Sequence, residues 1–160
     1  MLNKDNLIQY FSDGIKLKGS EKIGTEHEKF IYSKKDLSLI PFHGERSISS
    51  VLKKFIENGW DPIIEDEQIV GANKNQASIT LEPGGQFELS GAPLNNLHET
   101  CREINDHLSF TKSLEEEFDI GFLGIGYIPL GNFNDMPKVP KKKIPANNDS
   151  LHEKNWWPWT

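Results

Sequence analysis

The chain has 160 residues, of which 36% are hydrophobic and 26% are charged, and its net charge is −6. This length suits one domain with a buried core, and the acidic balance argues against nucleic-acid binding as the main role, because phosphate binding needs a basic surface. The single cysteine, Cys101, excludes an intrachain disulfide and a cysteine-based zinc cluster.

The first half of the chain predicts two helices with a strand between them. Apolar residues at helical spacing predict a helix over Lys4–Lys16, and residues 22–30 read as a strand. A second helix is predicted to begin after Ser47 as N-cap and to end at about Asn58. The apolar stripe of the first, amphipathic helix consists of Leu7, Ile8, Phe11 and Ile15. The buried stripe expected on the second helix consists of Val51, Leu52, Phe55 and Ile56.

The middle of the chain predicts an antiparallel meander. Three consecutive strands are expected over Trp60–Ile64, Gln68–Ala72 and Gln76–Glu82, with residues 73–75 as a hairpin turn. A fourth strand is expected over residues 86–89. Short polar turns between successive strands favour a mainly antiparallel sheet.

The longest predicted helix covers Pro93–Glu117, and a buried strand is expected over residues 120–128. The residues expected on the buried face of this helix are Leu94, Leu97, Cys101, Ile104 and Leu108. His98 and Cys101 lie one helical turn apart, and they are assigned to a packed helix face rather than to a Cys–His catalytic pair. The order of elements predicts an α+β fold, a mainly antiparallel sheet with flanking helices.

No apolar run along the chain approaches transmembrane length. The N-terminus also lacks the apolar segment of a signal peptide. We therefore expect a cytoplasmic protein that has no membrane partner.

Carboxylates recur on two of the predicted strands. On the first strand Glu26 and Glu28 point to the same face, because a strand turns alternate side chains to one side, whereas His27 points away. On a later strand Glu82 leads into a Pro-Gly-Gly turn. The residues that share one face beyond this turn are Gln86, Glu88 and Ser90. Two strands that present carboxylates inward are what an oxygen-only site for a hard divalent cation requires.

These patterns also have plainer interpretations. Glu26 and Glu28 alone fit a solvated strand face, and metal binding is favoured only when Glu82 and Glu88 are added to them. Residues 83–85 lack the spacing and the following lysine of a phosphate-binding loop, so a tight strand connection is predicted there.

Two long motifs carry a family resemblance. GTEHEKF at residues 24–30 is followed by LEPGGQFELSG at residues 81–91, and the similarity extends through residues 92–94, 97–101 and 137–138. On these motifs the chain resembles the plant-type branch of glutamate–cysteine ligase, a branch shared with many proteobacteria.

The resemblance implies a fold like that of glutamine synthetase, with an antiparallel sheet that forms a funnel of magnesium-binding carboxylates. Residues 1–140 would be the N-terminal portion of this catalytic domain. The implied chemistry is ATP-dependent: the γ-carboxylate of glutamate is phosphorylated, and the cysteine amine displaces phosphate to give γ-glutamylcysteine, the first step of glutathione synthesis. Mg²⁺ is the implied cofactor, and it would neutralise the charge of the triphosphate. ATP, glutamate and cysteine are the implied small-molecule substrates.

The resemblance also implies roles for single residues. Glu26 and Glu28 match the family's Gly-x-Glu-x-Glu pair of metal ligands, and Glu88 matches another metal-binding glutamate. Glu82 is implied as a metal ligand or as a substrate contact. The residues implied to face the same pocket as substrate-binding groups are Gln86 and Ser90. No catalytic residue is assigned, because most groups that grip glutamate and the ATP phosphates are expected further along the family's sequence.

Residues 141–160 differ in character from the rest, since three of the four tryptophans lie among the last five residues. One interpretation is a disordered or membrane-touching tail. Alternatively, codons for this stretch read one base later from within Lys142 can encode Lys-Arg-Tyr-x-x-Ile-Met-x-x-Tyr-Met-Lys-Lys-Ile-Gly-Gly-x-Gly, close to the family's continuation. We therefore expect a longer ligase cut off by a frameshift near Lys142, and a fragment that is inactive alone and poorly folded where its sheet has lost partner strands.

Two other functions stay open at the level of sequence. One is an ATP-dependent carboxylate–amine ligase with a different amine acceptor, and the other is a non-enzymatic acidic domain that binds a divalent metal or a protein partner. The length and specificity of the two motifs favour the glutamate–cysteine enzyme.

Overall fold

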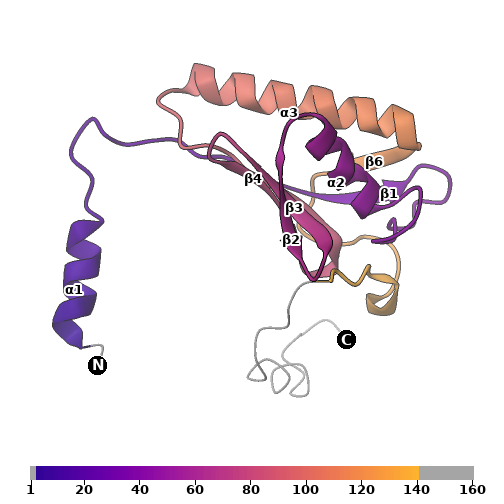
Figure 1. The fold of residues 1–160 in the computed structure, drawn as a ribbon, viewed down its shortest axis with the longest axis horizontal. Helices are drawn as coiled ribbons and strands as arrows, with labels where there is room; N and C mark the ends of the chain where they lie inside the picture. Colours follow the sequence, from indigo (N-terminus) through magenta and orange to yellow (C-terminus); the bar gives the residue numbers. More distant parts are fainter. Residues whose placement is uncertain (1–2, 141–160) are drawn as a thin grey trace.

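The computed structural model describes residues 3–140, which form an α+β fold around one antiparallel sheet of six strands (Figure 1). The strand order across the sheet is β2-β3-β4-β5-β1-β6. The strands are β1 (Glu26–Ser33), β2 (Asp61–Glu65), β3 (Gln68–Lys74), β4 (Ala77–Glu82), β5 (Gln86–Ser90) and β6 (Ile120–Leu123). The helices are α1 (Lys4–Asp13), α2 (Ile48–Glu57) and α3 (Leu97–Phe118), and the 3-10 turns are η1 (Pro83–Gly85) and η2 (Phe133–Asp135). The predicted fold class is confirmed, whereas the expected frameshift near Lys142 and the tail at 141–160 lie outside the described residues.

The meander from β2 to β5 forms as predicted. Its first two hairpins close through two-residue turns, Asp66-Glu67 with φ of 45° and 65° and Asn75-Gln76 with φ of 49° and 70°. Positive φ at both central residues matches the right-handed twist of the flanking strands. The second turn lies slightly later than the predicted turn at 73–75, because β3 runs through Lys74.

Helix α2 also forms as predicted. Ser47 is its N-cap and accepts a hydrogen bond at Oγ from the Ser50 N–H at 3.1 Å, and Asn58 is its C-cap. One side of the helix is buried against the sheet. The buried residues of α2 are Ile48, Val51, Leu52 and Phe55.

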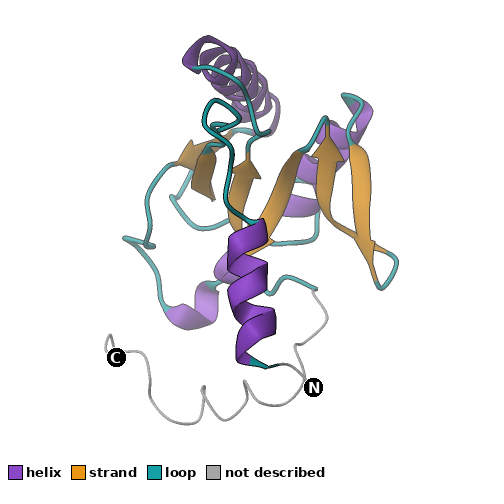
Figure 2. Cartoon of the chain, turned by 90° about the vertical axis from the view of Figure 1, so that its left-hand side faces the viewer, coloured by secondary structure: helices purple, strands orange, loops and turns teal. Residues whose placement is uncertain are grey.

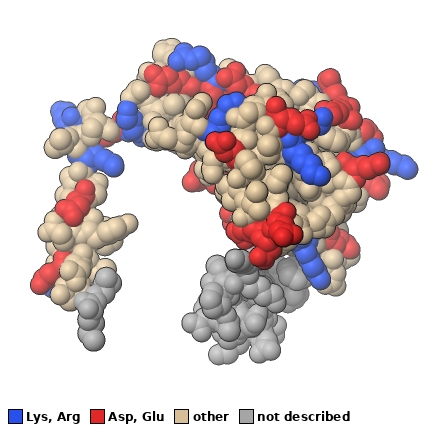
Figure 3. Space-filling view, viewed as in Figure 1, with Lys and Arg blue, Asp and Glu red and all other residues tan. Residues whose placement is uncertain are grey.

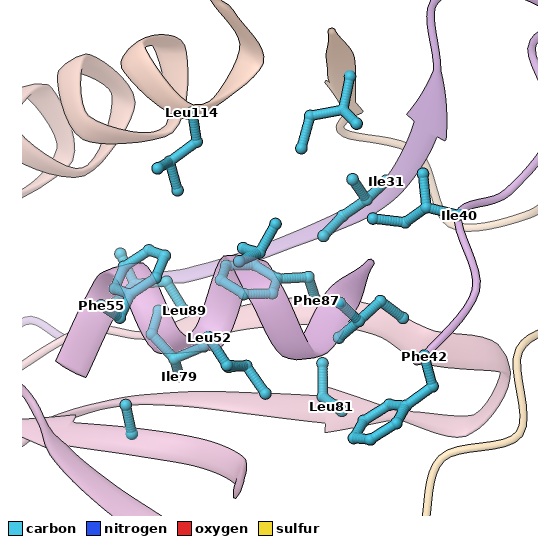
Figure 4. Packing of buried hydrophobic residues seen from close by; sticks show 14 of the residues in the cluster. Ile31, Ile40, Phe42, Leu52, Phe55, Ile79, Leu81, Phe87, Leu89 and Leu114 are labelled. Carbon is cyan, nitrogen blue, oxygen red and sulfur yellow. The ribbon is translucent and has the colours of Figure 1, made fainter. Parts of the chain in front are cut away.

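The hydrophobic core lies between one face of the sheet and the helices α2 and α3 (Figure 4). Phe55 of α2 and Phe87 of β5 lie at its centre, with ring centroids 5.5 Å apart. Leu114 of α3 is 1% exposed and belongs to the same cluster. Burial of each side chain of this size contributes about 1.5–3 kcal/mol relative to an exposed position.

The predicted buried face of α3 is wrong. Leu97 and Leu108 are 67% and 45% exposed, and both His98 and Cys101 are exposed, so these two form no packed face. Leu94 precedes the helix, which begins only at Leu97. The residues of α3 that are buried are Thr100, His107, Thr111 and Leu114.

Polar residues of the sheet explain this difference. The sheet presents Lys29 toward α3, where its Nζ contacts His107. His107 is therefore buried opposite Lys29, whereas Thr100 and Thr111 are buried with their hydroxyl groups donating to the Asn96 and Leu108 carbonyls. Apolar periodicity alone therefore selects the wrong face of the helix. The strand after α3 is also shorter than predicted, because β6 ends at Leu123 rather than continuing to residue 128.

Helix α1 stands apart from the sheet in Figure 1, and in the view of Figure 2 it lies in front of the sheet. It begins with a capping box between Asn3 and Asn6 and ends three residues before the predicted end at Lys16. None of its residues is buried, and even Phe11 in the predicted apolar stripe is 73% exposed. The amphipathic pattern therefore predicted the helix but not its packing.

The surface carries acidic side chains in several groups with lysine and arginine between them (Figure 3), in keeping with the net charge of −6. Among residues 3–140 no helix has the length and apolar character needed to cross a membrane.

Candidate functional site

The register of the central strands places the predicted carboxylates on one face of the sheet. β1 pairs with β5 so that Glu28 lies directly opposite Glu88 and Glu26 lies opposite Ser90. Directly paired residues turn to the same face, with Cβ atoms about 4.5–5.5 Å apart. The neighbouring pair Lys29 and Phe87 turns to the core, so the carboxylates lie on the face that α2 and α3 leave uncovered.

Glu82 shares this face at a greater distance. It ends β4 and pairs with Gln86 of β5, while Thr80 pairs with Glu88. β5 lies between β4 and β1, so two strand spacings, about 9–10 Å, separate the strand of Glu82 from that of Glu28, and Glu82 is also displaced by two residues along the strands. Glu82 therefore lies too far from Glu28 to share an ion held between Glu28 and Glu88, and its role stays a prediction.

Gln86 and Ser90 contact the carboxylates directly. Gln86 Nε2 donates a hydrogen bond to Glu28 Oε2 at 3.1 Å, and Ser90 Oγ donates to Glu88 Oε1 at 2.7 Å. Gln86 Nε2 also donates to the carbonyl of Ile125 at 3.5 Å, which links the site to the segment after β6. The two residues predicted to bind substrate thus orient the carboxylates, and their role toward substrate stays a prediction.

The carboxylates have no cationic side chain as a partner in the described part of the chain. No ion pair among residues 3–140 includes Glu26, Glu28, Glu82 or Glu88. Residues 3–140 also contain no group of three or more His, Cys, Asp or Glu side chains placed to hold a metal ion. Carboxylates directly opposite each other repel, and a hard cation with oxygen ligands would remove that repulsion. The donor chemistry therefore fits Mg²⁺, and the metal role stays a prediction.

The Pro-Gly-Gly turn is a tight strand connection, as predicted. η1 joins β4 to β5, and Gly84 and Gly85 have φ of 77° and 75°. A Cβ at Gly85 would lie 2.6 Å from Pro137 Cγ and 2.8 Å from Ile48 Cδ1. The packing of Pro137 and of α2 against the turn therefore accounts for Gly85 without a bound phosphate.

A buried pair that was not predicted lies behind the carboxylates. Lys29 and His107 are 6% and 7% exposed, and Lys29 Nζ lies 3.0 Å from His107 Nε2. Because the ammonium group can only donate, His107 accepts at Nε2 and carries its proton on Nδ1. Within the described residues that Nδ1 is buried without a hydrogen-bond partner.

Burial changes the acidity of these basic groups. Loss of solvation lowers the pKa of Lys29 to about 8. Loss of solvation, together with the charges of Lys29 and His27, lowers the pKa of His107 to about 3. His27 points away from Glu26 and Glu28, as predicted, and lies on the face that α3 covers. Loss of solvation and the charge of Lys29 lower the pKa of His27, while Glu103 opposes the shift. The only sign of the buried Lys29–His107 pair in the sequence is that Lys29 shares a strand face with the apolar residue Ile31.

Comparison with known proteins places these features in a family. Residues 22–147 match the family described as Glutamate-cysteine ligase family 2 (GCS2). The chain belongs to this family. It is 46% identical over 140 residues to glutamate–cysteine ligase A, chloroplastic, of Oryza sativa subsp. japonica. The aligned residues make up 88% of this chain and 28% of the relative. The identity to glutamate–cysteine ligase, chloroplastic, is 48% for Medicago truncatula and 44% for Arabidopsis thaliana, covering 88% of this chain and 27% and 26% of those relatives.

The chain therefore spans about a quarter of the length of these relatives, 28%, 27% and 26%. The names of the relatives contradict the predicted cytoplasmic location, since all are called chloroplastic. That prediction relied on the lack of a leader segment, and such a lack is uninformative in a chain that matches only part of its relatives.

Proposed function

We propose that the chain is the N-terminal part of an ATP-dependent ligase that joins the γ-carboxylate of glutamate to the amine of cysteine. The observation that carries the proposal is the pairing of Glu28 with Glu88 on the uncovered face of the sheet, inside the two motifs of a glutamate–cysteine ligase family member. The substrates come from the names of the relatives, glutamate–cysteine ligases.

The proposed reaction has two steps. A γ-carboxylate oxygen of glutamate attacks the γ-phosphorus of ATP, which forms an acyl phosphate and releases ADP. The amine of cysteine then attacks the acyl carbon, phosphate leaves, and the amine loses a proton. Both reactants of the first step are anionic, so the site must reduce their mutual repulsion.

The residues on the uncovered face would have two roles, metal binding and orientation of the metal-binding carboxylates. Glu26, Glu28 and Glu88 would each contribute oxygen ligands to Mg²⁺ sites that the substrate phosphates, water and the rest of the longer protein complete, with Glu82 at a further ion or at substrate. Bound Mg²⁺ supplies positive charge that neutralises the phosphate oxygens and aligns them with the attacking carboxylate. Gln86 and Ser90 hold the Glu28 and Glu88 carboxylates in orientation through the hydrogen bonds described above.

We further propose that the chain alone is inactive and that it derives from a longer reading frame interrupted near Lys142. The partial coverage of the relatives and the family-like text that codons for residues 142–159 can encode one base later support this. Sequencing of the source DNA tests it: a family frame should continue one base later beyond the stop codon, and its absence would refute the interruption.

Calorimetry of Mg²⁺ and ATP binding tests the function. The longer protein that the restored frame encodes should bind both and release phosphate when cysteine and glutamate are present. Glu26→Gln and Glu88→Gln should each abolish Mg²⁺-dependent binding, because each removes an anionic ligand. Glu116→Gln, at an exposed position of α3, is the matched control and should bind as the parent does.

Three results would change the proposal. If the longer protein binds no nucleotide, the acidic binding-domain interpretation replaces the ligase. If it releases phosphate with another amine but not with cysteine, the acceptor is wrong and the ligase stands. If both glutamine variants bind Mg²⁺ normally, the metal site lies elsewhere.

A further inference from the structure

Helix α3 contacts the start of β1 and the end of β5 through the carboxylate of Glu103. Glu103 Oε1 accepts a hydrogen bond from the Ala92 N–H at 2.8 Å, and Thr25 Oγ1 donates to Glu103 Oε2 at 3.5 Å. Glu103 is half-buried, between the helix and the ends of the strands.

These two contacts meet where β1 begins and β5 ends. Thr25 directly precedes Glu26, and Ala92 follows Ser90 by two residues, so Glu103 binds both sides of the Glu26–Ser90 pair. The Gly91 N–H donates to the Thr25 carbonyl at 2.6 Å and completes the junction.

The space at this junction is filled. A Cβ at Gly91 would overlap Glu103 Oε2 and would lie 2.7 Å from Thr25 Oγ1. The glycine that ends the second motif thus lets the Glu103 carboxylate reach the backbone of both strands.

One helical turn further along α3, His107 contacts Lys29 of β1 at 3.0 Å. Residues four apart lie on the same side of a helix, so Glu103 and His107 hold β1 from behind at two points. The Glu26 and Glu28 carboxylates project from the strand between these two points, on the opposite face.

We propose that Glu103 is a positioning residue: it joins the ends of β1 and β5 and thereby fixes the spacing between the carboxylates of the two strands. This inference rests on the proposed function, because it assigns Glu103 to the metal-binding face. Glu103 itself contacts neither metal nor substrate in this proposal.

Amide hydrogen exchange of the 160-residue chain tests the junction directly. In Glu103→Ala the Ala92 and Gly91 amides should exchange about tenfold faster, because the carboxylate no longer closes the junction. Glu103→Gln keeps an oxygen acceptor and should stay close to the parent. Asp106→Ala, which removes an exposed carboxylate from the same helix, should leave both amides unchanged.

The Mg²⁺ dependence of phosphate release by the longer, frame-restored protein tests the positioning. Glu103→Ala should raise the Mg²⁺ concentration for half-maximal rate several-fold, and Glu103→Gln should restore most of it. A variant that merely unfolds in part would lose rate at every Mg²⁺ concentration without shifting the midpoint.

The proposal is overturned if the Ala92 amide is unaffected in Glu103→Ala, if exchange accelerates equally over the whole sheet, or if the Mg²⁺ midpoint does not move. Failure of the proposed function is recognised separately. In that case the parent itself shows no Mg²⁺-dependent phosphate release, while the exchange data still decide whether Glu103 holds the two strands together.

Discussion

The burial of Lys29 against His107 makes the stability of the chain depend on pH. Both groups have a lower pKa in the folded chain than their usual values of 10.5 and 6.5. Between its folded and unfolded pKa each group is neutral when folded and protonated when unfolded, so unfolding takes up protons. Stability therefore rises with pH across each window, from about 3 to 6.5 for His107 and from about 8 to 10.5 for Lys29.

The first prediction concerns the acid side. The free energy of unfolding should fall by about 2 kcal/mol between pH 7 and pH 5 through His107 alone. His107→Gln keeps an acceptor for Lys29 but does not titrate, so its urea unfolding should show a correspondingly smaller change. Equal changes in parent and variant would contradict the buried pair.

The second prediction concerns the turn between β4 and β5. Gly85→Ala places a Cβ against Pro137 and Ile48 at a positive φ, and should lower the free energy of unfolding by about 1–3 kcal/mol. Gly126→Ala is the control, because no atom lies within 4 Å of its Cβ position. Thermal unfolding of both variants measures the difference, and equal midpoints would count against the packed turn.

Among the elements, α3 shows where sequence reasoning succeeds and where it stops. Its existence follows from helical spacing, and the strands follow from alternation and turn residues. The side of α3 that is buried depends on Lys29, which lies 78 residues from His107 in the chain. Local periodicity contains no information about such a partner. The role of Glu103 could not be predicted for the same reason, because its contacts with Thr25 and Ala92 form only when the sheet is assembled.

The faces of the site strands were more predictable than the helix face. Alternation alone placed Glu26 and Glu28 on one face of the first strand, and it likewise placed Gln86, Glu88 and Ser90 on one face of the later strand. Register is different, because it is set by pairing across the sheet. The direct opposition of Glu28 and Glu88 could therefore not be read from either strand.

The third prediction tests the corrected face of α3. Leu114→Ala should cost about 2–5 kcal/mol, because Leu114 is 1% exposed within the core. Leu108→Ala on the same helix should stay within about 0.5 kcal/mol, since Leu108 is 45% exposed. Urea unfolding compares them, and the reverse order would restore the face predicted from sequence.

At the scale of the whole molecule, helix α1 is joined to the rest of the chain but does not pack against it. Deletion of residues 1–16 should change the free energy of unfolding of the remainder by less than about 0.5 kcal/mol, because no residue of α1 is buried. This fourth prediction is measured by urea unfolding of the shortened and full chains. A loss well above that figure would show that the helix packs on the body in solution.

The two outer strands of the sheet bear on aggregation. β2 carries Pro62, which has no amide hydrogen, and a bulge between Ile63 and Ile64. β6 has only four residues, and the Phe122 N–H donates to Glu115 Oε1 at 3.1 Å. Short, kinked or covered edges discourage the addition of strands from other molecules. Among residues 3–140, the edges at β2, at β6 and at the first half of β1, which β6 does not pair, therefore offer neighbouring chains only short or kinked stretches on which to stack.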